Sequence, residues 1–276
     1  MPEVDEVIDA PARRGALELR ARWRLGRALK ARRYSQAIVL PNTWKSALVP
    51  FFADIPVRSG YVGESRFGLL NLFYRSSKQP GPMPLHYARL SEAPGREPRQ
   101  PLPEGRLRVE AREIAAATRR FAVPEGYAVL CPGAEYGPAK RWPYFGELAA
   151  KLEAPVVLLG ARGDVESSRG IAGINLVGET TLDEAVALLA GARFAVSNDS
   201  GLMHVAAALG TPQVALFGSS SPERTPPLSA RARVLWLHPE CSPCFARECP
   251  LGHFRCLREL PPARVIAEIA ALGVLN

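Results

Sequence analysis

Residues 195–218, AVSNDSGLMHVAAALGTPQVALFG, narrow the possible folds more than any other stretch of this chain. Short β-prone apolar runs stand at both ends, and the segment between them has the length and composition of one helix. The polar turn before Gly201 contains residue types that cap helices, and the glycine would let a ligand approach the backbone. The stretch predicts a strand, a helix and a second strand. Its first turn either binds a phosphate or merely caps the helix through Asn198 or Asp199, with His204 packed against the sheet.

A second loop of matching character lies at 131–152, CPGAEYGPAKRWPYFGELAAKL. It follows a short apolar strand and places Lys140 and Arg141 just before a helix opened by Pro143. In a parallel open sheet both loops lie at the carboxyl ends of strands, where ligands bind. Lys140 and the amides of 199–201 together suit a diphosphate, although a solvated Lys-Arg pair fits the sequence equally well.

Prolines mark a boundary between two domains. Residues 76–105 carry seven of the 26 prolines and show neither helical nor strand periodicity. We therefore expect an amino-terminal domain at 1–105, which ends in this Pro-rich region, and a carboxyl-terminal domain at 106–276.

The two domains differ in how many strands the sequence predicts. In the second domain a helix at 109–121 is followed by βα units, with strands near 127–131, 155–159, 174–177, 193–197 and 213–217. This alternation predicts a doubly wound parallel sheet in an α/β fold. In the first domain only 4–8, 37–40 and a stretch near Val57 have strand character, so its sheet is expected to be incomplete.

Two more positions follow from the predicted sheet. Asp164 comes soon after the strand PVVLLG, where its carboxylate could accept hydrogen bonds from ribose hydroxyls, cap the next helix, or simply be solvated. Thr181 and Glu184 have the T-x-x-E spacing of a capping box, so helix initiation explains both without a ligand.

The net charge of +8 and the pI near 9.5 indicate anionic partners. Much of the excess lies at 13–33, where arginines surround an apolar helical stripe formed by Leu17, Ala21, Leu25, Ala28 and Leu29. This segment is either an ordinary helix with a solvated basic face or a face that approaches anionic lipid. Nucleic-acid binding is not expected, because no DNA- or RNA-binding motif accompanies the charge.

Length and hydropathy point to a globular cytosolic protein. The 276 residues, 47% of them hydrophobic, suffice for two modest cores. No apolar run reaches the length of a membrane helix, and the acidic start MPEVDEVID lacks the pattern of a signal peptide.

Four of the five cysteines are clustered in the pattern C-x2-C-x4-C-x6-C, at Cys241, Cys244, Cys249 and Cys256. Disulfides are not expected in a cytosolic protein, and four thiols could hold a structural zinc ion. Reduced, packed thiols are the alternative, because the spacing of the second pair is atypical of zinc sites.

Four segments together, 40–71, 132–143, 198–218 and 219–229, resemble glycosyltransferase family 9, the bacterial inverting heptosyltransferases. The resemblance implies a GT-B fold of two Rossmann-like domains, the first on the acceptor side and the second binding the nucleotide sugar. It also implies transfer of L-glycero-D-manno-heptose from ADP-heptose to the inner-core heptose of lipopolysaccharide, a lipid-anchored acceptor at the inner membrane surface. No cofactor is implied for catalysis.

The same resemblance implies roles for individual residues. The donor would be held by Lys140, Asp164, Thr180, Asp199, Ser200, Gly201, Leu202 and His204, with Gly178 to Thr180 beside the adenine. Lys140 and the helix amino terminus would stabilise the leaving diphosphate. The acceptor-side candidates are Lys45, Arg58 and Arg66, for each of which a solvated surface position is equally compatible with the sequence.

The resemblance leaves the general base without a match in this sequence. Relatives begin with a strand and a Gly-containing loop that carries the proposed catalytic aspartate, ahead of the segment that here starts MPEVDEV. We therefore expect the base upstream of Met1, and expect this shortened chain to bind nucleotide sugar poorly and to transfer heptose negligibly. Two alternatives remain: a family 9 transferase with a different acceptor, and a non-catalytic nucleotide-binding protein.

Overall fold

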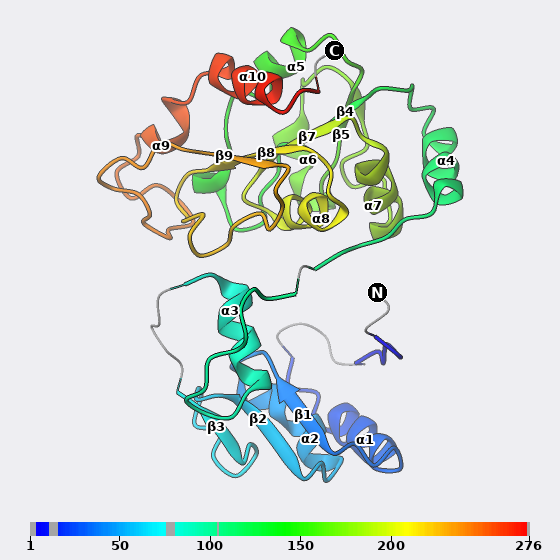
Figure 1. The fold of residues 1–276 in the computed structure, drawn as a ribbon, viewed down its shortest axis with the longest axis vertical. Helices are drawn as coiled ribbons and strands as arrows, with labels where there is room; N and C mark the ends of the chain where they lie inside the picture. The colour runs from blue at the N-terminus through cyan, green and yellow to red at the C-terminus, as the bar shows by residue number, and fades with distance from the viewer. Residues whose placement is uncertain (1–3, 11–15, 76–80, 104, 275–276) are drawn as a thin grey trace. The chain divides into compact units, whose positions relative to one another are not determined.

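The computed structural model describes residues 4–10, 16–75, 81–103 and 105–274. The chain divides into two compact units, a smaller one within residues 2–103 and a larger one within 104–276 (Figure 1). No helix in the described ranges is long and apolar enough to cross a membrane.

The larger unit is built on a six-stranded sheet in which every pair of neighbours is parallel. The strands lie in the order β6-β5-β4-β7-β8-β9. Their bounds are β4 Ala128–Cys131, β5 Val156–Leu158, β6 Ile174–Asn175, β7 Phe194–Asn198, β8 Gln213–Phe217 and β9 Ala232–Trp236. Chain order reverses between β4 and β7, as in Rossmann folds, and ligands bind outside the strand ends at such a switch point.

Helices cover both faces of this sheet, as Figure 1 shows for α5 and α10 on one side and α7 and α8 on the other. The first layer comprises α5 (Phe145–Lys151), α9 (Arg255–Arg258) and α10 (Pro262–Ala271), and the second α4 (Ala111–Arg120), α7 (Leu182–Gly191) and α8 (Gly201–Leu209). The short α6 spans Val165–Ser168. Because both faces are covered, β4, β5, β7 and β8 are buried throughout, and their residues are apolar except at the end of β7 and the start of β8.

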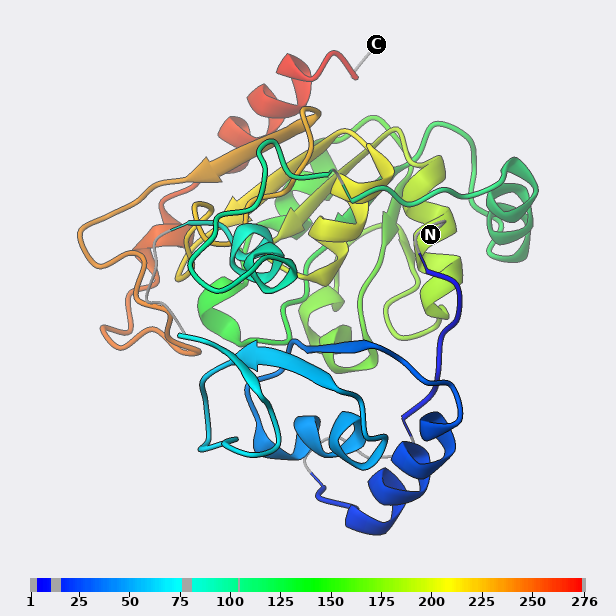
Figure 2. The same cartoon turned by 60° about the horizontal axis from the view of Figure 1, so that its bottom comes forward.

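The smaller unit contains a three-stranded parallel sheet of β1 (Gln36–Val39), β2 (Val57–Tyr61) and β3 (Leu72–Tyr74). Its helices are α1 (Leu19–Lys30), α2 (Leu48–Phe52) and α3 (Met83–Ala88). Figure 2 shows α1 beside α2, and the two backbones approach closely at Gly26. A Cβ atom on Gly26 would lie 2.5 Å from Cβ of Phe52.

Several sequence predictions require correction. Residues 4–8 form no strand and their side chains are exposed, because no neighbouring strand pairs with them in the described ranges. Strands β3 and β9 were not expected. Leu17 lies before the start of α1 and is exposed, and Ala28 within the helix is exposed as well, so neither belongs to the packed stripe, whereas Ala21, Leu25 and Leu29 are half-buried.

Candidate functional site

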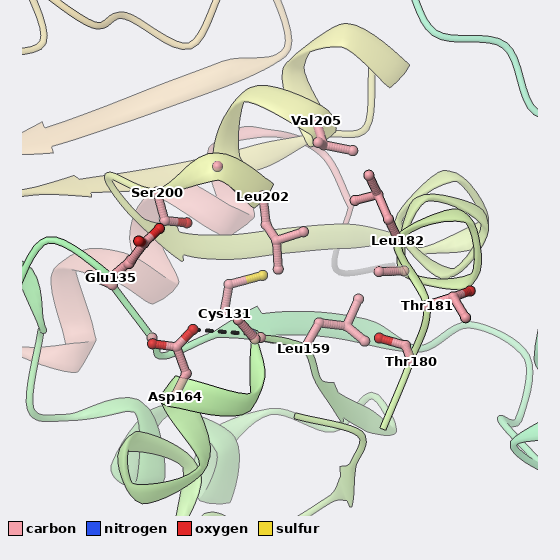
Figure 3. A pocket seen from close by; sticks show the side chains of 16 residues that line it. Cys131, Glu135, Leu159, Asp164, Thr180, Thr181, Leu182, Ser200, Leu202 and Val205 are labelled. Atoms are coloured by element: carbon pink, nitrogen blue, oxygen red, sulfur yellow. Dashed lines mark hydrogen bonds between the residues drawn. The ribbon is translucent and has the colours of Figure 1, made fainter. Parts of the chain in front are cut away.

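A cavity of about 420 Å³ lies at the switch point of the larger unit. Its walls come from the residues that follow β4, β5 and β7 and from the start of α7. Figure 3 shows Glu135, Asp164 and Ser200 at one end, Thr180 to Leu182 at the other, and the apolar Cys131, Leu159 and Leu202 between them. An elongated ligand with a polar and an apolar part fits such a lining.

Helix α8 begins at this cavity, and no side chain among the described residues caps its first amides. Its N-cap is Ser200, whose side chain makes no capping hydrogen bond and instead lies 3.1 Å from the Ser197 hydroxyl. Nothing lies within 4 Å of the position that a Cβ atom would take at Gly201. Neither Asn198 nor Asp199 caps the helix, so the alternative that this turn serves only as a helix cap is wrong. The amides at the start of α8 therefore stay available to an anion.

Lys140 and Asp199 form an ion pair beside the cavity. The Lys140 ammonium donates to Oδ2 of Asp199, and the Ser220 hydroxyl donates to the same oxygen, each at 2.5 Å. Both partners of the pair are largely shielded from water. The alternative of a solvated Lys140 is therefore excluded. Ser220 was missed, although its position just after β8, the strand next to β7, was a usable signal.

Asn198 fixes the loop that carries Lys140. Its fully buried amide donates to the Pro132 carbonyl at 2.8 Å and accepts from the Trp142 backbone N–H at 3.0 Å. One side chain at the end of β7 thus holds both ends of loop 132–142. Asp199, the next residue, pairs with Lys140 near the end of that loop.

Asp164 lines the cavity but also has structural contacts. It accepts a hydrogen bond from the Ala161 N–H at 3.1 Å, which closes a single helical turn, and lies 3.9 Å from the Arg141 guanidinium. Gly133 is in contact with it so closely that a Cβ atom there would overlap the carboxylate. Capping is therefore observed, and the predicted contact with ribose hydroxyls stays a prediction.

His204 does not pack against the sheet, because its side chain is exposed on α8. Part of the side chain reaches solvent, but the protein around the ring desolvates it and lowers its pKa, while the Asp199 carboxylate opposes the lowering and Lys140 adds to it. The imidazole is therefore neutral at neutral pH and able to hydrogen-bond a ligand hydroxyl. Thr181 and Glu184 form the expected capping box, which leaves Thr180 as the polar side chain free of that role.

The three acceptor-side candidates lie in the smaller unit. Arg66 is 2% exposed, donates to the carbonyls of Pro41 and Tyr61, and has its pKa lowered by burial. Arg58 donates to two carbonyls as well and is half-buried, so neither arginine is a solvated surface residue. Lys45 is also half-buried. Binding of the acceptor by these residues stays a prediction.

The sequence of residues 22–255 matches the profile of glycosyltransferase family 9 (heptosyltransferase). Lipopolysaccharide heptosyltransferase 2 of Escherichia coli is 43% identical over 99% of this chain and 85% of the relative. Lipooligosaccharide heptosyltransferase 2 of Haemophilus ducreyi is 39% identical over 99% and 86%.

A solved structure agrees with these sequence matches. The structure of E. coli ADP-heptose lps heptosyltransferase II superposes with a TM-score of 0.83 at 41% identity, covering 92% of this chain and 81% of that one. Matches of this extent, together with the two-domain α/β architecture and the cavity at the switch point, show that the chain belongs to glycosyltransferase family 9, the heptosyltransferases.

Proposed function

We propose that this glycosyltransferase moves L-glycero-D-manno-heptose from ADP-heptose to the inner-core heptose of lipopolysaccharide. The observation that carries the proposal is the cavity at the β4/β7 switch point, with the uncapped α8 terminus at its polar end and the Lys140–Asp199 pair beside it. The apolar lining suits an adenine ring near Thr180, and the polar end suits a diphosphate. Relatives named lipopolysaccharide and lipooligosaccharide heptosyltransferase 2 are 43% and 39% identical over nearly the whole chain.

The chemistry follows from the charges at the polar end. Loss of ADP from the sugar places negative charge on the β-phosphate, and Lys140 together with the α8 amides would oppose it. These groups are fixed before the reaction, so no catalytic metal is needed in this scheme. ADP is a good leaving group, and an inverting transfer then requires only a base for the acceptor hydroxyl. Asp199 and His204 would hydrogen-bond hydroxyls of the donor.

Selectivity for donor and acceptor tests the proposal. By calorimetry we expect weak but measurable binding of ADP and ADP-heptose, in line with the affinity expected from the sequence, and none of UDP- and GDP-sugars. By mass spectrometry we expect trace transfer of heptose to acceptors that carry the first core heptose and none to acceptors lacking it. Transfer to the latter only would indicate a different family 9 acceptor. Donor binding without transfer to either would indicate a non-catalytic nucleotide-binding protein, and either result contradicts the proposal.

A weak contact between α1 and anionic lipid belongs to the same proposal. Trp23 is half exposed on this helix and lies between the exposed Arg20, Arg24 and Arg27 on its outer face. Within the described residues Lys30 and Arg32 form ion pairs, whereas none involves Arg20 or Arg24. An exposed tryptophan among arginines is typical of helices that lie on a lipid surface, where they meet a lipid-anchored acceptor.

Sedimentation with vesicles tests the contact. We expect binding to vesicles containing phosphatidylglycerol and not to pure phosphatidylcholine, with loss of binding in high salt. Arg24→Ala should weaken binding about fivefold, since one basic side chain near an anionic surface contributes about 1 kcal/mol. Arg112→Ala, an exposed arginine on α4, is the control. Equal binding by both variants and the parent would exclude α1 as the lipid-binding face.

A further inference from the structure

Residues 237–254, between β9 and α9, contain no helix or strand. Loops of this length without secondary structure are uncommon in compact domains and usually functional. We call this segment the thiol loop, because it contains Cys241, Cys244 and Cys249, and the fourth clustered cysteine, Cys256, follows it at the start of α9. The thiol loop therefore depends on side-chain and irregular backbone contacts, rather than on the hydrogen bonds of a helix or sheet, for its shape.

All four of these cysteines line one cavity of about 100 Å³, together with His253. None of them forms a disulfide. The fifth cysteine, Cys131, lies apart from them in β4. Four cysteines within sixteen residues of chain thus border one space that is large enough for an ion.

Cys249 is held in place by the turn that follows it. Its sulfur accepts the Phe254 N–H at 3.4 Å and lies 4.0 Å from Nδ1 of His253. The same Nδ1 accepts the Arg255 N–H at 3.1 Å. These contacts fix the Cys249 side chain beside the cavity that the other three cysteines line.

We propose that Cys241, Cys244, Cys249 and Cys256 bind one structural metal ion of the thiolate-preferring class, with Zn²⁺ as the ion. As they stand, no three cysteine, histidine or carboxylate side chains in the described residues are arranged around a common ion position. Binding therefore requires the thiols to turn into the cavity that they line, with Cys244 moving in from its exposed position. Four thiolates around a tetrahedral zinc ion satisfy its coordination without a water ligand, as in structural sites.

The ion would brace the loop that carries Lys140. The Ala139 N–H donates to the Arg247 carbonyl at 3.0 Å, and the Tyr136 hydroxyl donates to the Phe245 carbonyl at 2.5 Å. Gly137, with φ at 146°, packs against the same Arg247 carbonyl, where no side chain would fit. Backbone carbonyls of the thiol loop thus contact three residues of the Lys140 loop, namely Tyr136, Gly137 and Ala139.

Metal analysis tests the proposal independently of substrate or activity. Protein purified without an affinity metal or chelator and supplied with Zn²⁺ should retain about one equivalent after gel filtration. Cys244→Ser should retain less than about 0.1 equivalent, and because this side chain is exposed, the variant should fold. Cys131→Ala, which removes the cysteine outside the cluster, should retain the full equivalent.

Thiol titration gives a second measure on the parent protein. Cys244 should react slowly with a thiol reagent when zinc is bound and rapidly after chelation. Less than a tenth of an equivalent of zinc or iron in the supplied parent protein, with Cys244 reactive from the start, would overturn the proposal. A full equivalent retained by Cys244→Ser would overturn the four-thiolate site as well.

Discussion

Lys140 is held in place by the Asp199 carboxylate, which also accepts a hydrogen bond from the Ser220 hydroxyl. Lys140→Ala should weaken ADP-heptose binding by about 1.5 to 3 kcal/mol, the contribution of a hydrogen bond to a charged group. Calorimetry measures the affinity, and circular dichroism should show an unchanged fold. Lys151→Ala, an exposed lysine at the end of α5, is the control. An unchanged affinity in Lys140→Ala would remove this lysine from the donor site.

Asn198 should affect both stability and binding. Asn198→Ala leaves the Pro132 carbonyl and the Trp142 N–H buried without their partner, which should cost about 2 kcal/mol or more in the free energy of unfolding. It should also weaken ADP-heptose binding, because loop 132–142 loses its anchor. Thr211→Val is the matched control, since it removes a buried hydrogen bond to the Leu189 carbonyl away from this loop. If both variants lost stability and neither lost affinity, Asn198 would have no positioning role.

For single residues, the sequence predicted which side chains lie near the site but not which hydrogen bonds and ion pairs they form. Lys140 and Asp199 were expected near each other because their loops follow strands of one parallel sheet and so lie at the same edge. The contacts of Asn198 depend on one rotamer of a buried amide, which composition does not reveal. Arg66 has the sequence context of a surface arginine, and only its burial among the carbonyls of its own unit shows otherwise.

Among the helices, two glycines with the same local sequence role should respond oppositely to substitution. Gly26→Ala should destabilise the smaller unit by about 1 to 3 kcal/mol, because the new Cβ would overlap Phe52 and force α1 away from α2. Gly146→Ala should stabilise the larger unit by about 0.5 kcal/mol, since its nearest neighbour, a carbon of Ile171, lies 4.0 Å away. Urea unfolding measures both. A stabilising Gly26→Ala would contradict the close approach of the helices.

Strands were predictable where burial makes the sequence mostly apolar. Strands β4, β5, β7 and β8 were expected from such runs, and each is found. The strand expected at 174–177 is found as the two-residue β6, which is not buried throughout. Strand β9 lies at the edge of its sheet with the exposed Arg233 and Val234 in it, so its pattern is weak. Strand β3 has only three residues. Residues 4–8 alternate between apolar and polar side chains, but such a segment forms a strand only when a neighbouring strand pairs with it.

For the molecule as a whole, we expect the nucleotide to bind to the larger unit alone. A 100-fold excess of ADP over its dissociation constant should stabilise the larger unit by about 2.7 kcal/mol. Hydrogen exchange should slow in the loops after β4, β5 and β7, which line the cavity. Slower exchange elsewhere, without any change in these three loops, would place the nucleotide at another site.

The uncapped start of α8 has a consequence for how this enzyme trades stability against activity. An aspartate at position 200 would accept hydrogen bonds from the first backbone N–H groups of α8 and should raise the free energy of unfolding by about 1 kcal/mol. The same carboxylate would occupy the anion site and repel the diphosphate, so Ser200→Asp should be more resistant to urea and bind ADP more weakly than the parent. Selection for function would then keep this helix end less stable than another residue could make it. Heat-resistant relatives should gain their stability at other helix ends and leave this one open.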